Sequence, residues 1–171
     1  MPGVASLEAA RYYAHPRNAF WPIVLALLDG EPPGARPARP ARRGVAERPA
    51  PYEARTARLV DAGIALWDVL AECERPGSLD TAIRRDSERP NDIVALVERH
   101  PELVLVAFNG QTAAKLFARH VGERVRAMRP DLGYATLPST SPAHASLTLA
   151  DKYARWHAAL APTLAAAAGD R

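Results

Sequence analysis

Apolar residues along the chain form three short continuous runs that are typical of buried strands. The clearest run is Leu103 to Phe108 (LVLVAF), whose unbroken apolar character is expected of a strand covered on both faces. Ile64 to Leu70 (IALWDVL) is a second run bounded by turn signals, and Tyr134 to Leu137 is a shorter one that Pro138 ends. We therefore predict three strands at these positions.

Other segments repeat apolar residues at helical spacing. We predict helices over residues 19–28, 52–62, 91–99, 112–120 and 147–168. Pro22 fits the first of these only within its first turn, and Asn91 or Asp92 is the expected N-cap of the third. The inward positions we expect are Leu59, Val60, Ile93, Leu96, Val97, Ala113, Leu116, Phe117, Tyr153, Trp156 and Leu160. Residues 77–89 are polar and are expected to be irregular, with a short helical turn.

Strands that alternate with helices predict an α/β fold with a parallel sheet and helices on both faces, a three-layer α/β/α arrangement. In such sheets ligands bind at the carboxyl ends of the strands. Two polar clusters follow predicted strands, Asn109-Gly110 and Ser139-Thr140-Ser141. We expect both clusters to lie around one crevice.

A segment rich in Pro and Arg interrupts this pattern between Glu31 and Pro51 (EPPGARPARPARRGVAERPAP). It has no apolar periodicity, which is typical of an extended, flexible loop. A surface insertion is the favoured interpretation, and a basic arm that touches phosphates is the alternative. With 171 residues, we expect one domain over residues 1–171 that carries this insertion.

Composition narrows the possible classes. The net charge of +3 and the pI near 9.3 would suit a polyanion without requiring one. Cys73 is the only cysteine, which excludes an intramolecular disulfide and a cysteine-ligated iron–sulfur cluster. No apolar run approaches the roughly 20 residues of a membrane-spanning helix, and the N-terminus does not resemble a signal peptide. We expect a cytoplasmic protein that is not attached to a membrane.

The candidate functional residues have neutral, polar side chains. The five histidines show no metal-ligand spacing, and the chain has no phosphate-binding glycine loop or nucleophile elbow, so we expect neither a metal nor another cofactor. The informative residues are Asn18, Asn109, Ser139 and Ser141, which the predicted elements place at loop tips. Amide and hydroxyl groups are suited to reading the edge of a heterocycle or holding a water molecule.

Four segments occur in an order that resembles a known family. MPGVAS, YYAHPRNAFW (Tyr12 to Trp21), VAFNG and LPSTSPAHA follow one another over residues 1–145. They are similar to the motif series of the hypoxanthine-DNA glycosylases, a branch of the uracil-DNA glycosylase superfamily, and to the mismatch-specific uracil glycosylases. The resemblance implies that superfamily's fold with a short central parallel sheet. Its first strand has no counterpart before Met1, and we expect that strand to be missing from this chain.

The resemblance also implies roles for individual residues. Asn18 matches the asparagine that positions the attacking water, Tyr13 the aromatic residue that stacks on the extruded base, and Asn109 the asparagine that recognises the base edge. The turn at Met1-Pro2-Gly3 matches a segment whose backbone lies along the base. The Ser139 to Ala145 loop matches the one that enters the minor groove, and its implied DNA contacts are Ser139, Ser141, Pro142 and Ala143, with His144 as a donor to the departing base.

Each of these residues also has a purely structural interpretation. The aromatic residues Tyr12, Tyr13, Phe20 and Trp21 are the kind found in cores, and the resemblance leads us to keep only Phe20 and Trp21 there. Asparagines commonly end strands or cap helices, as Asn109 and Asn18 would. Serines and histidines such as Ser139, Ser141 and His144 often satisfy only local turns.

The implied reaction is removal of hypoxanthine, with uracil as the nearest alternative, by hydrolysis of the N-glycosidic bond in DNA. A fixed carboxamide at Asn109 can accept from the ring N–H of these bases and donate to their carbonyl, provided that neighbours prevent it from flipping. No lysine lies in the motifs, so a Schiff-base step is not expected. We expect a monomer that acts on DNA containing deoxyinosine or deoxyuridine. The rival hypotheses are a DNA-binding member that has lost catalysis, a uracil-specific enzyme and, less favoured, a nucleoside hydrolase.

Overall fold

The computed structural model describes residues 4–34, 51–76 and 80–169. These residues form two compact units, each assembled from two stretches of chain: Met1–Asn18 with Leu66–Thr140, and Ala19–Ala65 with Ser141–Arg171. The single domain expected from the sequence stays a prediction. Most of the Pro/Arg-rich segment, residues 35–50, lies outside the described residues.

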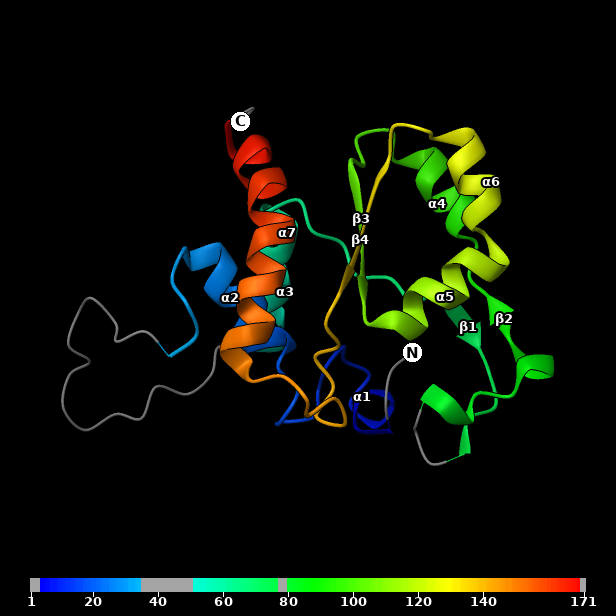
Figure 1. Cartoon of the computed structure of the whole chain (residues 1–171), viewed down its shortest axis with the longest axis horizontal. Helices are drawn as coiled ribbons and strands as arrows, with labels where there is room; N and C mark the ends of the chain where they lie inside the picture. The colour runs from blue at the N-terminus through cyan, green and yellow to red at the C-terminus, as the bar shows by residue number, and fades with distance from the viewer. Residues whose placement is uncertain (1–3, 35–50, 77–79, 170–171) are drawn as a thin grey trace. The chain divides into compact units, whose positions relative to one another are not determined.

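The first unit contains a parallel strand pair. Strand β3 (Leu105–Asn109) pairs with β4 (Gly133–Leu137) in a register that runs from Leu105↔Gly133 to Asn109↔Leu137. The two strands are joined through helices α5 (Gln111–His120) and α6 (Gly122–Met128), which together with α4 (Ile93–Arg99) lie to one side of the pair (Figure 1). The predicted α/β class with a small parallel sheet is therefore confirmed.

The core of this unit lies between the parallel strands and these helices. It consists of Ile93, Val97, Phe108, Phe117, Val121, Val125 and Leu132. Helix α4 begins as predicted, because the Asp92 side chain accepts a hydrogen bond from the Ala95 N–H at 3.1 Å. On the strand's other side, Ala107 is exposed and Val104, just before the strand, is 61% exposed, and the covering of β3 on both faces stays a prediction.

Helix α6 was not predicted. Its seven residues place only Gly122 and Val125 inside, and that is too few apolar positions to reveal a helical period.

The strand predicted over Ile64 to Leu70 was wrong except at its last residue. Strand β1 spans Leu70–Glu72 and pairs antiparallel with β2 (Arg89–Pro90). The preceding residues form no strand, and Asn91 instead holds them through bonds from its N–H to the Val69 carbonyl at 2.9 Å and from Nδ2 to the Asp68 carbonyl at 2.8 Å. The rest of the unit comprises α1 (Val4–Glu8) and the 3-10 turns η2 (Asp80–Ala82) and η3 (Arg85–Ser87), which agree with the short helical turn expected over residues 77–89.

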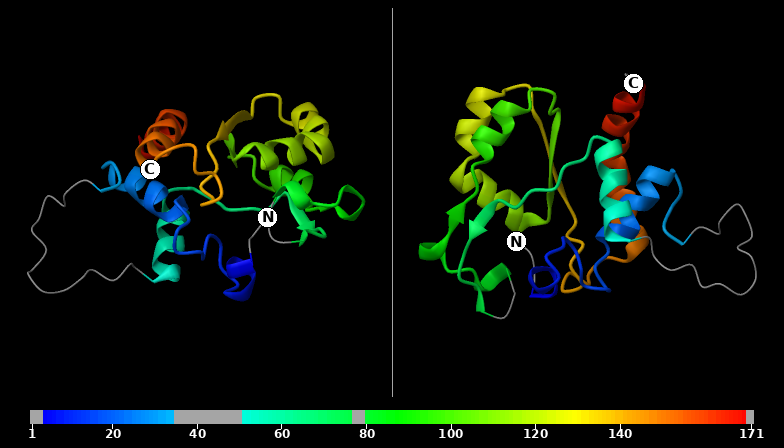
Figure 2. Two further views of the ribbon diagram at one scale, coloured as in Figure 1. Left: turned by 60° about the horizontal axis from the view of Figure 1, so that its bottom comes forward. Right: turned by 180° about the vertical axis from the view of Figure 1, so that it is seen from behind.

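In the part of the second unit that the structure describes, the helices are α2 (Phe20–Asp29), α3 (Tyr52–Asp61) and α7 (Leu149–Gly169) (Figures 1 and 2). The ring of Phe20 packs edge-on against Trp156 at a centroid distance of 6.0 Å, and Trp21 packs edge-on against Tyr52 at 5.7 Å. The prediction that Phe20 and Trp21 belong to the core is confirmed.

For these helices, one prediction is confirmed and another was wrong. Helix α2 ends at Gly30, whose positive φ of 70° suits the glycine predicted to stop it. Val60 is 72% exposed although it was expected to point inward, because it follows the buried Leu59 and turns about 100° away from it on the helix. Within the described residues, no helix is both long and apolar enough to span a membrane.

One buried carboxylate ties the segment before β2 to α5. Glu88 is 7% exposed, and both of its side-chain oxygens lie 2.7 Å from Nη1 of Arg119. Nε2 of His120 is 2.6 Å from Oε2 of Glu88. Burial tends to raise the pKa of Glu88, but the hydrogen bonds and positive charges of Arg119 and His120 outweigh it and lower the pKa.

We predict that Glu88→Gln destabilises the protein by about 2–3 kcal/mol at pH 7. This loss of stability is smaller than that expected on breaking a fully buried ion pair, because the Arg119 side chain is 37% exposed. A lowered pKa in the folded state means that the carboxylate stabilises the fold above the ordinary pKa of glutamate, and that this stabilisation is lost as the pH falls through the folded pKa. Thermal unfolding should therefore show a difference between wild type and variant that is largest near pH 7 and shrinks as the pH falls below the ordinary pKa of glutamate. The exposed Glu98→Gln is the control, and an equal effect of both substitutions would contradict the assignment.

Candidate active site

The carboxyl ends of β3 and β4 are joined by a pair of side-chain hydrogen bonds. Nδ2 of Asn109 donates to Oγ1 of Thr140 at 2.8 Å, and the main-chain N–H of Thr140 donates to Oδ1 of Asn109 at 2.9 Å. Thr140 is only 1% exposed, so both bonds are shielded from water. The two polar clusters that the sequence placed at strand ends do meet here.

Gly110 makes this close approach possible. Its φ of 102° is favourable only for glycine, and a Cβ at this position would come within 3.1 Å of the Cβ of Ser139. The Gly110 N–H also donates to the Leu137 carbonyl at 3.0 Å. The half-buried Ser139 is therefore held against the start of α5.

The contact with Thr140 fixes how the Asn109 carboxamide is oriented. A carboxamide has two N–H donors and two acceptor lone pairs, and Thr140 uses one of each. The threonine hydroxyl can donate or accept, but its main-chain N–H can only donate, so a flipped amide would face that N–H with its own N–H groups. One donor and one acceptor of Asn109 remain.

Tyr13 lies beside this amide. Burial raises the pKa of the Tyr13 hydroxyl, a side-chain hydrogen bond with Asn109 opposes the rise, and the negative charge of Asp68 adds to it. Tyr13 also has a positive φ of 55°, an uncommon backbone conformation for a residue with a large side chain. The segment is held from α1, where the buried Ser6 hydroxyl accepts from the Ala14 N–H at 3.2 Å. Strained backbone of this kind concentrates at functional sites.

Sequence reasoning missed two residues of this cluster. Asp68 lies close enough to Tyr13 for its charge to act on the hydroxyl, and a single acidic residue inside the apolar run IALWDVL was the available signal. Thr140 stood in a cluster that was expected at the site but was not singled out. No local signal distinguishes it from Ser139 or Ser141, because its role depends on Asn109, 31 residues away.

The sequence also predicted Asn18, Pro2 and Gly3 of the first unit at the site. Asn18 is half-buried at the end of a loop in which its N–H donates to the His15 carbonyl at 2.9 Å. Pro2 and Gly3 lie outside the described residues. The turn expected at Met1-Pro2-Gly3 thus stays a prediction, and helix α1 begins directly after it, at Val4.

From Ser141 onward, the predicted DNA-binding loop belongs to the second unit and precedes α7. Within it, Oγ of Ser141 accepts from the Ala143 N–H at 3.2 Å, and the Ser141 carbonyl accepts from the His144 N–H at 3.0 Å. These bonds form a compact turn that exposes Pro142, Ala143 and His144.

Lys152 holds this turn from the first turn of α7. Its Nζ donates to the His144 carbonyl at 2.7 Å, the residue is 5% exposed, and burial lowers the pKa of its ammonium group. The helix start itself is capped by reciprocal bonds between Thr148 and Asp151. The loop is thus fixed at its base while its tip remains accessible.

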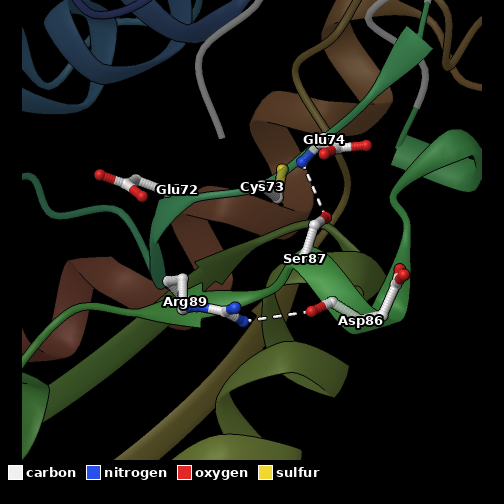
Figure 3. A pocket seen from close by; sticks show the side chains of 6 residues that line it. All are labelled: Glu72, Cys73, Glu74, Asp86, Ser87 and Arg89. Atoms are coloured by element: carbon white, nitrogen blue, oxygen red, sulfur yellow. Dashed lines mark hydrogen bonds between the residues drawn. The ribbon is translucent and has the colours of Figure 1, made fainter.

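A cavity of about 400 Å³ beside β1 and β2 is a different feature (Figure 3). Three carboxylates and one guanidinium line it, from Glu72, Glu74, Asp86 and Arg89, together with Cys73 and Ser87. None of the residues predicted to act on a substrate lines this cavity. Its excess of negative charge is unfavourable for a polyanion.

Three comparisons place this geometry among known proteins. No protein-family model matches the chain. Its structure is similar to the solution NMR structure of a candidate uracil DNA glycosylase from Methanosarcina acetivorans, with a TM-score of 0.67, 28% sequence identity, and coverage of 96% of this chain and 86% of that one.

Two curated relatives are named hypoxanthine DNA glycosylase. The protein from Methanosarcina barkeri is 30% identical over 115 residues, which cover 67% of this chain and 62% of that protein, so the match spans less than two thirds of this relative. The protein from Methanosarcina acetivorans is 32% identical over 146 residues, which cover 84% of this chain and 76% of that protein. These matches confirm the resemblance inferred from the four motifs: the chain belongs to the hypoxanthine DNA glycosylase family.

Proposed function

We propose that this protein is a monofunctional DNA glycosylase that removes hypoxanthine from DNA by hydrolysing its N-glycosidic bond and leaves an abasic site. The names of both curated relatives and of the similar solved structure support a glycosylase acting on deaminated bases. The structural observation that carries the proposal is the Asn109 carboxamide, held by Thr140 beside Tyr13 at the carboxyl end of a parallel strand. An enzyme that acts on a base must take it out of the stack into a site of this kind.

The held amide can distinguish a deaminated base from its parent. Deamination replaces an exocyclic amino group, which donates, with a carbonyl oxygen, which accepts. The Asn109 amide has two donors and two acceptor lone pairs, and Thr140 and Tyr13 together engage three of these four groups. The sequence led us to expect that the amide bonds both a ring N–H and a carbonyl of the base, but the one remaining group can make only one of these bonds. We propose that the group of the amide left by these contacts bonds the base edge, with the Tyr13 hydroxyl, which can donate or accept, beside it.

The hydrolysis needs little from a general base. As the C1′–N bond lengthens, its electron pair leaves with the base and the sugar becomes oxocarbenium-like, as in glycoside hydrolysis. Water then adds to C1′, and its released proton balances the charge on the departing base. An amide such as Asn18 suffices to orient that water, while Tyr13 supports the extruded base by stacking and His144 donates to it.

The exposed turn over Ser141, Pro142 and Ala143, together with Ser139 before it, would contact the DNA backbone around the extruded nucleotide. The Lys152–His144 bond supports this role because it fixes the base of the turn without occupying its tip. Two alternatives remain distinct: a uracil-specific enzyme, and a member that binds DNA without cleaving it.

Purified protein should release hypoxanthine from a duplex that holds one deoxyinosine, so that alkali then cuts the labelled strand at that position. A duplex with deoxyuridine tests the uracil-specific alternative, and an undamaged duplex is the control. Borohydride should trap no covalent complex, because the candidate motifs contain no lysine and the nearby Lys152 is buried and bonded. Retained binding without strand scission on either lesion would refute the enzyme and leave the DNA-binding alternative.

Asn18→Ala should lower the single-turnover rate on deoxyinosine by about 100-fold, because a misplaced attacking water costs roughly that factor. The melting temperature should change little, since Asn18 is half-buried in a loop. Turnover equal to that of wild type would remove Asn18 from the mechanism.

Thr140→Val should reduce excision of deoxyinosine by about tenfold, because the Asn109 Nδ2 loses its acceptor at a cost of roughly 1.4 kcal/mol. Thr140→Ser keeps the hydroxyl and should stay within about threefold of wild type. Single-turnover rates on deoxyinosine and deoxyadenosine duplexes measure both rate and discrimination. If the valine and serine variants behave alike, the hydroxyl does not hold the amide.

A further inference from the structure

A second cavity of the first unit lies along α5, the helix that begins directly after Asn109 and Gly110. It has a volume of about 230 Å³ and lies between α5 and the η2–η3 segment, open to solvent on one side. It is lined by Asp80, Arg85, Glu88, Thr112, Lys115 and Arg119, together with two apolar side chains. We refer to it as the α5 cavity.

The wall of the α5 cavity is built on a buried charge. Glu88 is 7% exposed and accepts from Arg119 and His120, which fixes the end of η3 against α5. Two carboxylates and three cationic side chains line the cavity, but the carboxylates are already engaged. Glu88 is satisfied by Arg119, and Asp80 accepts from Arg75 at 2.8 Å.

Two cations are left over. Neither Arg85 nor Lys115 has an acidic partner within the described part of the chain, and both are exposed. Thr112 adds a neutral hydroxyl on the same helix as Lys115. Two cationic side chains and a hydroxyl around one small cavity are the groups that bind phosphate oxygens.

The position of the α5 cavity relates it to Asn109. Lys115 lies four residues, or about 6 Å along the helix, beyond the start of α5 at Gln111, and Asn109 lies two residues before that start. One DNA strand rises about 3.4 Å per nucleotide, so a separation of this order spans roughly one to three nucleotides. A strand whose base is read at Asn109 thus carries a phosphate within reach of the cavity.

We propose that the α5 cavity is a phosphate subsite that holds the DNA backbone one to three nucleotides from the extruded base, through Arg85, Lys115 and the Thr112 hydroxyl. The location relative to the base rests on the proposed function, whereas the binding of a backbone phosphate does not. We do not count Arg119 as a phosphate ligand, because Glu88 neutralises its charge. The acidic cavity beside β1 is excluded as the subsite by its three carboxylates.

The test measures binding to a duplex with a tetrahydrofuran abasic analogue, which cannot be turned over. The variants are Arg85→Ala, Lys115→Ala and the double variant, and Arg124→Ala on the exposed side of α6 is the matched control. Loss of one phosphate contact should reduce the slope of log affinity against log salt by about 0.9 in the double variant and weaken binding by about tenfold at low salt. The control should reproduce the wild-type slope, and melting temperatures verify folding.

A phosphate-by-phosphate scan locates the contact. Neutral methylphosphonates are placed singly at three positions on either side of the abasic analogue. Wild-type binding should weaken most at one of these positions, and the double variant should lose that position's effect. An unchanged salt slope in the double variant, or a scan identical to that of wild type, overturns the subsite.

The outcome is separable from that of the glycosylase proposal. Excision of deoxyinosine with an unchanged salt slope overturns only the subsite. Absence of excision with a reduced slope overturns only the enzyme and keeps the backbone contact.

Discussion

The two hydrogen bonds between Asn109 and Thr140 are the constraint on which the proposed site depends. The parallel pair has only two strands of five residues, a sheet too small to fix the loops that follow it by itself. The bonds hold the residues after β4 against the start of α5, and Gly110 allows that contact by carrying no side chain. They also orient the amide that Tyr13 touches. One buried contact therefore connects the fold to the chemistry of the site.

The sequence predicted those elements whose signal is local. The helices α2, α3, α5 and α7 and the strands β3 and β4 combine a clear apolar pattern with a recognisable end, such as Gly30 after α2 or Pro138 after β4. The strand predicted over residues 64–70 failed because apolar composition does not say which partner is available. Residues 64–69 are as apolar as a strand, yet Asn91 bonds the carbonyls of Asp68 and Val69, and no strand among the described residues pairs with residues 64–69.

The candidate site was predictable to the extent that it follows from topology. Asn109 and the cluster around Thr140 end neighbouring parallel strands, so their proximity follows from the predicted βαβ unit. The sequence could not rank Thr140 above its serine neighbours, since only the fold buries it against Asn109. The role of Lys152 could not be predicted for a similar reason. A lysine in a helix is ordinarily solvated, and nothing in the sequence indicates that its ammonium group reaches back to the His144 carbonyl.

Net charge was the least informative feature of the sequence, and η3 shows why. Consecutive residues of a 3-10 turn point about 120° apart, so neighbours in sequence can face different surroundings. Arg85 lines the α5 cavity, whereas Asp86, the next residue, lines the acidic cavity beside β1 (Figure 3). Glu88 then neutralises Arg119 without contributing free charge to either. The overall charge of +3 does not show that one cavity has an excess of cationic side chains and the other an excess of carboxylates. Where a polyanion can bind therefore depends on how the charged side chains are distributed over the surface.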